Sequence, residues 1–410
     1  MTEEPRMPGP TPTSIESIAD HVRAHHARAV ERLERLVNHD TPSMDARANR
    51  EAIAMISRWC KAHGATVEVV DAGAAHADHL IARWPARAVD GDQILILNHV
   101  DTVWPGDETQ RRPFHRNGDR ATGPGIFDMK CGIIQSIEAI DAARSVDPLE
   151  RTSITLIVTS DEEVGSPTSR SLIEREALKS ALVLVAEPSS DGALKTARKS
   201  VGMYEITAEG RAAHAGLEPE AGRSAILEMA RQIPIIDALN DSAVGTTVTL
   251  GVIAGGSARN VVAERCTIHV DVRAALPEEA HRVHEALTNL QPIGEGINLH
   301  CAGGTNRPVM ERTSSTAHVF ARAKAIAEDL GEPLQETVVG GGSDGNFTAA
   351  LGRPTLDGLG AVGGGAHAVH EWIDLPRSLL QRTSLLAGLL VDHARTSSAD
   401  VAGHPPNGVN

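Results

Sequence analysis

The pattern of apolar and polar positions predicts alternating strands and helices in the first half of the chain. Apolar residues recur at helical spacing over residues 15–37 and 44–63. Three short apolar runs follow, each bounded by polar residues, at 94–97, 154–158 and 182–185. Helical stretches separate these runs, at 129–144 and 169–179. Apolar strands that alternate with helices are typical of a buried, mostly parallel sheet flanked by helices, so we expect an α/β fold.

The second half of the chain begins with a different pattern. Four predicted strands lie at residues 203–208, 247–254, 261–272 and 297–302. Predicted helices at 223–239 and 277–290 lie between them, which gives the β-α-β-β-α-β order of a ferredoxin-like unit. Helices near 318–330 and 379–393 then resume the first pattern. We therefore expect an α/β domain from residues 1–199 and 313–410, interrupted by an α+β domain at 200–312.

Composition excludes several classes of protein. A chain of 410 residues fits two domains, and its net charge of −15 argues against nucleic acid or an anionic membrane as partner. No apolar run approaches the roughly 20 residues of a spanning helix. The opening MTEEPRMPGPTPTS has neither the basic nor the apolar region of a signal peptide, so we expect a cytoplasmic protein. The four cysteines lie far apart, which favours reduced thiols.

Acidic and imidazole side chains follow each of the three apolar runs, in the segments NHVD, TSDEE and AEPSS. Open parallel sheets bind ligands at the carboxyl ends of their strands, so these side chains should converge. His99 and Asp101 are two residues apart and share a face, where Asp101 can accept a hydrogen bond from the imidazole. Of Glu162 and Glu163, one can bind a metal while the other acts as a base.

Three further residues complete a candidate metal site. Glu187 follows the third run, Asp128 follows the turn Gly123-Pro124-Gly125, and His367 lies in a glycine-rich loop. Two histidines and three carboxylates suit a pair of zinc ions with one carboxylate bridging them. Taken singly, each pattern is more often a surface pair or a solvated helix cap. Their common placement after strands and tight turns favours a functional site.

The motifs occur in an order that resembles one enzyme family. They are HVDTVWP (99–105), TGPGIFDMKCG (122–132), TSDEEVGS (159–166), AEPSS (186–190), GRAAHAG (210–216), GGSARNVV (255–262), DVR (271–273) and GGGAHAVHE (363–371). From residue 25 to 393 the chain resembles the dinuclear zinc family of glutamate carboxypeptidase, aminoacylase and succinyl-diaminopimelate desuccinylase. The glutamate carboxypeptidase branch is the best match. The resemblance implies that residues 1–199 and 313–410 form the catalytic domain and that 200–312 form a dimerisation domain, or lid.

The resemblance also implies roles at the metal site. His99 and Glu187 would hold one zinc ion, Glu163 and His367 the other, and Asp128 would bridge the two. Asp101 would orient His99. Glu162 would be the general base that deprotonates the attacking water and then protonates the leaving amine. Cobalt or manganese could replace zinc at such mixed ligands.

Further roles follow for the other candidate residues. In the inserted domain, His214 resembles a histidine that reaches the active site of the partner subunit in a homodimer and stabilises the oxyanion. Asn260 resembles a substrate contact, and Arg273 matches a family arginine. Arg307 matches the arginine that binds the free α-carboxylate of the substrate. Lys195 lies near a substrate-side position, although an ordinary surface charge is the better interpretation for it.

Two enzymatic functions fit this pattern. The first is an exopeptidase that cleaves the amide next to a C-terminal amino acid, and the second is an N-acyl amino acid deacylase. A catalytically silent binding protein is disfavoured because Glu162 and all five ligands are present. With nine aromatic residues in the chain, no stacking clamp for a large ring is evident. We expect Cys131 to be a small packed residue and the remaining histidines, including His25 and His26, to face solvent.

Overall fold

The structure of the chain is a computed structural model that describes residues 11–73 and 76–402, with side chains up to Thr396. Part of the N-terminal segment on which the cytoplasmic location was predicted, residues 1–10, therefore lies outside the described residues. The chain forms two compact units, which we describe separately. Unit 1 is Met1–Thr196, Arg312–Thr337 and Ser343–Asn410, and unit 2 is Ala197–Glu311 and Val338–Gly342.

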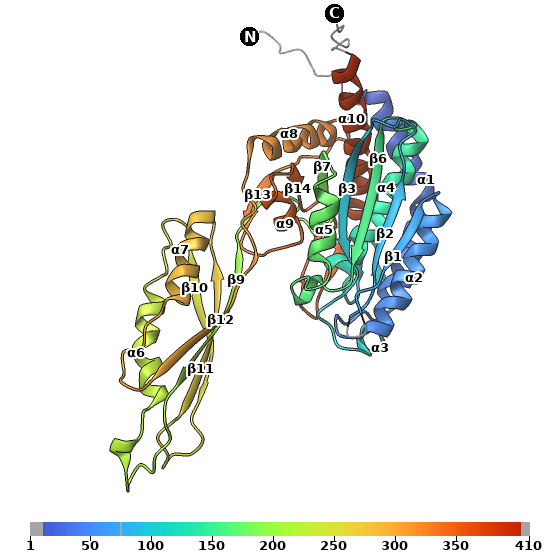
Figure 1. Ribbon diagram of the computed structural model, residues 1–410. Coiled ribbons are helices and arrows are strands. Elements are labelled where there is room, and N and C mark those ends of the chain that lie inside the picture. The colour runs from blue at the N-terminus through green and yellow to red at the C-terminus, as the bar shows by residue number, and fades with distance from the viewer. Residues whose placement is uncertain (1–10, 74–75, 403–410) are drawn as a thin grey trace, which may run out of the picture. The chain divides into compact units, whose positions relative to one another are not determined.

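Unit 1 is built on a six-stranded sheet (Figure 1). In spatial order its strands are β1 (Thr66–Val70), β2 (His79–Trp84), β6 (Thr152–Thr159), β3 (Asp92–His99), β7 (Leu182–Val185) and β14 (Thr355–Leu356). The four strands from β6 to β14 are parallel, whereas β1 and β2 pair antiparallel. The predicted α/β fold with a mostly parallel sheet is thus confirmed, and β1 and β2 are strands that the apolar pattern did not predict.

Helices cover both faces of this sheet because its central strands β6, β3 and β7 are largely buried on both sides. On β3, Ile94 and Ile96 pack into a large core, while Leu95 and Leu97 point to the opposite face. The large core is shared with α1 (Pro12–Val37), α2 (Ala46–Ala62), α4 (Cys131–Val146), α8 (Ser314–Asp329) and α10 (Thr383–Ala402). On the other face lie α5 (Arg170–Ala177) and α9 (Gly345–Ala350). The sheet is therefore a buried layer between helices.

A small antiparallel sheet in unit 1 joins two distant segments of the chain. Its strands are β15 (Gly363–Gly364), β16 (Trp372–Asp374), β5 (Arg120–Thr122) and β4 (His115–Asn117). Trp372 pairs with Thr122, which brings the segment around His367 next to the segment that leads to Asp128. The short helix α3 (Glu108–Arg111) precedes it, and β8 (Leu194–Arg198) pairs with β13 (Glu336–Val339) elsewhere. These short elements were not predicted.

Unit 2 has the β-α-β-β-α-β order expected from the sequence. Its elements are β9 (Val201–Glu209), α6 (Ala225–Asp237), β10 (Thr247–Gly255), β11 (Arg265–Arg273), α7 (Pro277–Thr288) and β12 (Asn298–Arg307). The strands form an antiparallel sheet in the order β10-β11-β9-β12, and both helices pack on one core with it. Unlike the predicted 200–312 domain, unit 2 includes the later segment Val338–Gly342. None of the helices in the described residues is long and apolar enough to span a membrane.

Candidate metal centre

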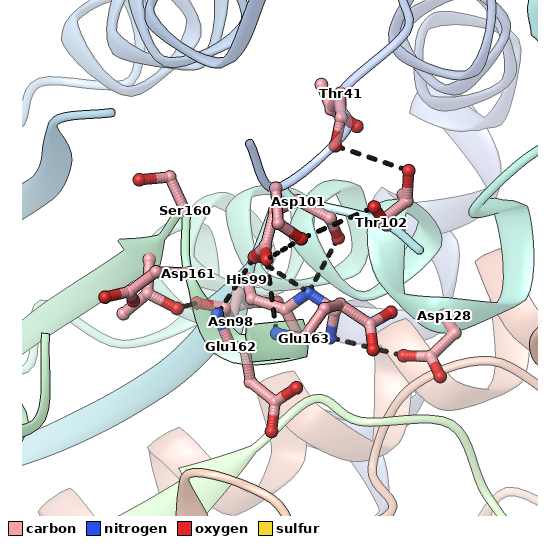
Figure 2. Close-up of polar contacts among 12 residues, drawn as sticks. Thr41, Asn98, His99, Asp101, Thr102, Asp128, Ser160, Asp161, Glu162 and Glu163 are labelled. Atoms are coloured by element: carbon pink, nitrogen blue, oxygen red, sulfur yellow. Dashed lines mark hydrogen bonds and ion pairs between the residues drawn. The ribbon is translucent and has the colours of Figure 1, made fainter. Parts of the chain in front are cut away.

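The strand register brings three candidate ligands to one edge of the unit 1 sheet. His99, the last residue of β3, is paired with Thr159 at the end of β6, and Leu97 is paired with Val185 at the end of β7. The segments that leave β6 and β7 carry Glu163 and Glu187. Because these strands are parallel and end together, side chains distant in sequence meet at their carboxyl ends. Figure 2 shows His99 and Glu163 at this edge, near Asp128.

His99 forms the centre of one half of this cluster. It is 2% exposed, and its Nδ1 donates a hydrogen bond to the backbone carbonyl of Asp101 at 3.0 Å. The proton is thereby placed on Nδ1, and Nε2 is available as a ligand atom. Nε2 lies 3.2 Å from Oδ1 of Asp128 and 3.5 Å from Oε1 of Glu187.

His367 forms the centre of the other half. Its backbone has a φ of 60°, and its Nε2 lies 3.4 Å from Oδ2 of Asp128 and 3.2 Å from Oε2 of Glu163. The two oxygens of Asp128 thus face different histidines, as a bridging carboxylate requires. Asp128 itself lies in the distorted turn Ile126–Lys130, and the peptide bond that follows it is cis.

Asp101 has more partners than the expected one. Its carboxylate Oδ1 lies 3.5 Å from Nδ1 of His99, so the backbone carbonyl of Asp101 is the nearer acceptor. The same carboxylate accepts hydrogen bonds from Ser43 Oγ at 2.7 Å and from the backbone N–H groups of Glu162 and Glu163, both at 3.2 Å. Asp101 therefore fixes the turn that carries both glutamates. Ser43 was not predicted to belong to this network.

Glu162 and Glu163 begin a single 3-10 turn, Glu162–Val164, but their side chains diverge (Figure 2). The Glu163 carboxylate points into the cluster, where it meets His367. Glu162 is half-buried, and its side chain extends away from His99 and Asp101. The structure therefore separates the Glu163 carboxylate, which contacts His367, from the Glu162 carboxylate, which points in another direction.

The donor set fits metal ions. Two ligand atoms on one tetrahedral zinc ion, with bonds of roughly 2.1 Å, lie about 3.4 Å apart. The separations in both halves of the cluster, 3.2–3.5 Å, agree with that value. In addition, Oε1 of Glu163 is buried and has no hydrogen-bond partner in the structure. A buried carboxylate oxygen without a donor is unfavourable unless a cation binds it.

The pKa shifts of the clustered side chains also favour the binding of a cation. Burial raises the pKa of Glu163 to about 6. Hydrogen bonds to Asp128 and Glu163 raise the pKa of His367 to about 10. Burial opposes the charged form of His99, yet its carboxylate neighbours outweigh this effect and raise its pKa well above the usual value. The cluster thus attracts positive charge strongly, and divalent cations are the stronger competitors for such carboxylates.

One further carboxylate ties the two metal-binding segments together. Glu371 is 1% exposed, and its Oε1 accepts hydrogen bonds from the backbone N–H groups of Phe127 and Asp128 at 2.8 and 3.0 Å. Its Oε2 accepts hydrogen bonds from the backbone of Gly125 at 2.8 Å and from Nε1 of Trp104 at 3.2 Å. No role was predicted for Glu371 from the sequence. Its position four residues after His367 was the available signal.

The remaining candidates lie elsewhere. In unit 2, His214 is exposed and its segment pairs with that of Asn260, whose carbonyl accepts from Ala215 N at 2.9 Å. Arg273 forms a two-pronged ion pair with Asp271 at 2.8 Å. Arg307 ends β12 and is 3% exposed. In unit 1, half-buried Lys195 on β8 pairs its backbone with Asp357.

Cys131 starts α4 and is fully buried, which agrees with the interpretation as a packed residue. Burial raises the pKa of the Cys131 thiol, and it raises the pKa of Cys60 to about 12. Because the thiolate is the reactive form, both should resist alkylation in the native protein. At pH 8 we expect a maleimide to label half-buried Cys301 first, and Cys60 and Cys131 only after unfolding. Peptide mass spectrometry over time would check this, and early labelling of Cys131 would contradict its burial.

Known proteins resemble this chain over most of its length. Carboxypeptidase G2 from Pseudomonas sp. (strain RS-16) is 28% identical over 371 residues, which cover 88% of each chain. Succinyl-diaminopimelate desuccinylase from Marinobacter nauticus is 26% identical over 314 residues, or 71% of this chain and 81% of that one.

Solved structures share the fold. Aminopeptidase PepT from Bacillus cereus matches with a TM-score of 0.69 and 23% identity, over 90% of this chain and 98% of that one. YXEP of Bacillus subtilis, described as a dinuclear metal-binding peptidase, matches with a TM-score of 0.63 and 17% identity, over 91% of this chain and 99% of that one.

The family match agrees with the site. The model of peptidase family M20/M25/M40 matches residues 95–392, a range that contains every candidate ligand described above. It begins within β3 and ends within α10. The family resemblance and the hydrolase class predicted from the sequence are thereby confirmed: the chain belongs to peptidase family M20/M25/M40.

Proposed function

We propose that the chain is a dinuclear metallohydrolase that cleaves an amide bond next to a C-terminal amino acid. The observation that carries this proposal is the shared carboxylate. Asp128 presents one oxygen to His99 and the other to His367, and each histidine has a second carboxylate beside it, an arrangement that would suit two adjacent metal ions. Zinc is the proposed metal because imidazole and carboxylate ligands suit it, and cobalt or manganese are substitutes.

Two divalent cations at this centre would polarise the scissile carbonyl and make a water molecule nucleophilic at neutral pH. Glu162 lies beside the ligand Glu163 and is proposed to accept the proton of that water at its carboxylate. The same carboxyl group then donates the proton to the nitrogen of the leaving amine. Asp101 supports both steps as a positioning residue, since it holds the backbone of Glu162 and Glu163.

The exopeptidase specificity rests on one residue of unit 2. We propose that Arg307 binds the free α-carboxylate of the substrate, because a guanidinium group pairs with a carboxylate through two parallel hydrogen bonds. We propose that Asn260 contacts the substrate as well. The guanidinium of Arg273 is already paired with Asp271, and Lys195 lies in unit 1, so we assign the substrate carboxylate to neither of them. The resemblance to carboxypeptidase G2 supports this choice.

An N-acyl amino acid deacylase is the second candidate function. The similarity to succinyl-diaminopimelate desuccinylase favours it, because the same centre would hydrolyse an amide whose acyl part determines specificity. In either case we propose that the substrate is a small peptide or N-acyl amino acid and that the enzyme works in the cytoplasm, where its four free cysteines stay reduced.

A release assay distinguishes the two functions. Metal-loaded protein is incubated with a matched panel of dipeptides and N-acyl amino acids, and free amino acid is measured with and without a chelator. We expect chelator-sensitive release that depends on the C-terminal residue, with acidic residues preferred. Release governed by the acyl group would establish the deacylase instead. If protein with two bound metals released nothing from any substrate, the hydrolase proposal would be wrong.

We also propose a homodimer in which His214 completes the active site of the partner subunit and stabilises the oxyanion. If so, Glu162→Gln and His214→Ala subunits should each be inactive as homodimers. Their mixture should recover activity, because a mixed dimer contains one site with both residues intact. Random pairing places about half of all subunits in mixed dimers, so up to a quarter of wild-type activity is expected. Mixed dimers verified by tagging that stay inactive would contradict action across the dimer.

A further inference from the structure

A second group of metal-binding side chains lies between α1 and α4, apart from the strand-end site. His21 and His25 are four residues apart on α1, and Asp141 on α4 faces them. Residues at this spacing lie on one face of a helix. One ligand atom from each of the three side chains lies within 4.8 Å of the others. These side chains are half-buried, and so is His26, so His25 and His26 face solvent only in part.

The separations suit a single ion. Nε2 of His21 lies 3.2 Å from Oδ2 of Asp141, and the rings of His21 and His25 have centroids 4.3 Å apart. Two ligand atoms on one tetrahedral zinc ion lie about 3.4 Å apart, so His21 and Asp141 are already in place. One ring nitrogen of His25 also lies within 4.8 Å of both ligand atoms, so a small shift of its ring would complete the site. Water can complete the coordination, since the site is half-exposed.

Hydrogen bonds to neighbouring groups orient His25 and Asp141 for binding a cation. Nδ1 of His25 donates to the backbone carbonyl of His21 at 2.9 Å, which leaves Nε2 of His25 unprotonated as the ligand atom. On the far side of Asp141, Nδ1 of His63 lies 3.0 Å from Oδ1. Such contacts fix the tautomer and the orientation of metal ligands in known sites.

Arg28 is the group that opposes a cation here, because it donates to Oδ2 of Asp141 at 2.9 Å. Its charge is shared, however, since the same guanidinium lies 2.5 Å from Oε2 of Glu138. Arg32 also pairs with Glu138, at 2.8 Å. The two arginines are therefore balanced by Glu138 and Asp141, and the histidines add no charge when neutral. A transition metal that binds imidazole is favoured over calcium or magnesium.

We propose that His21, His25 and Asp141 form a third metal site, which takes a divalent transition-metal ion such as zinc and clamps α1 to α4. Asp141 lies ten residues beyond the first residue of α4, about 15 Å along the helix from the turn that carries Asp128. The site shares no ligand with the strand-end cluster. It does not depend on the proposed function, and its loss should leave hydrolysis unchanged.

The test counts zinc ions. Wild-type protein is dialysed against buffered free zinc at a series of concentrations, and bound zinc per chain is measured by mass spectrometry of the metal. We expect a plateau at two zinc ions followed by a third, weaker step. In His25→Ala the third step should shift to at least tenfold higher zinc while the first two stay in place. Alanine favours helix, so α1 should fold in this variant, which circular dichroism would check.

His281→Ala is the matched control. His281 lies 3.1 Å from Glu285 four residues on along α7, and the neighbouring His284 contacts Tyr204 at 3.0 Å instead. This variant should keep all three steps. A wild-type protein that saturates at two zinc ions would overturn the proposal, and so would a third zinc ion that persists in His25→Ala. If the wild type bound only one zinc ion, and His25→Ala lost it, the strand-end centre would be disproved and the proposal for the site between α1 and α4 would stand.

Discussion

Replacing Glu162 by glutamine should abolish turnover while both metals stay bound. Glutamine has nearly the same shape but cannot accept the proton of the attacking water, so kcat should fall by about 10²–10⁴-fold. Metal content should be unchanged, because the contacts of His99, His367 and Asp128 do not involve the Glu162 side chain. The measurement pairs a kcat determination with metal analysis of the same preparation.

Glu163→Gln is the matched control, since the neighbouring side chain differs only in position. It removes a charged oxygen that lies 3.2 Å from His367, so it should lower metal content as well as activity. The contrast between a variant that keeps its metals and one that loses them separates the base from the ligand. Normal turnover in Glu162→Gln would remove Glu162 from the mechanism.

Replacing Glu371 by glutamine should weaken metal binding by about 10–100-fold, the range typical of groups that orient metal ligands. Each Glu371 oxygen accepts two hydrogen bonds, one pair from Phe127 and Asp128 and the other from Gly125 and Trp104. A glutamine must point its NH₂ group at one of these pairs, where donor faces donor. Buried donors without an acceptor destabilise by about 1–3 kcal/mol each, and the turn that presents Asp128 would shift. Competition with a chelator measures the affinity.

Trp104→Phe is a milder variant for comparison, because it removes one hydrogen-bond donor to Glu371 and leaves the three backbone hydrogen bonds in place. Its metal affinity should fall by far less than that of Glu371→Gln. Thermal unfolding of both metal-free variants would report any general loss of stability. Equal metal affinities in Glu371→Gln and the wild type would show that Glu371 does not position the ligands.

The fold was predictable where local pattern and tertiary structure agree. The runs at 94–97, 154–158 and 182–185 became β3, β6 and β7 because strands buried on both faces need apolar residues throughout. In β1, by contrast, no residue is buried, and β2 begins with a histidine and contains an arginine. These strands form by pairing with β6 and with each other, contacts that no short window of sequence reports.

The candidate site was predictable to the same extent. Ligands that end parallel strands must share an edge of the sheet, so position predicted His99, Glu187 and one of Glu162 and Glu163, and the family resemblance chose Glu163. Asp101 was assigned to His99 because period two places both on one face. The hydrogen bonds of its carboxylate to Glu162 and Glu163 depend on how the turn after β6 folds back, which the spacing does not contain. Glu371 escaped for the same reason, since its partners are backbone groups about 245 residues away.

That separation has a consequence for how the protein is made. The first segment of unit 1 ends at Thr196 and contains Glu162 with four of the five proposed ligands, but His367 and Glu371 follow only in its last segment. A ribosome must therefore translate all of unit 2 before the centre can close, and closing so long a loop is a slow step. If the proposed function is correct, Glu162 cannot act as a base in the nascent chain until His367 has joined the centre. Hydrolysis begins only after the segment that carries His367 has been synthesised.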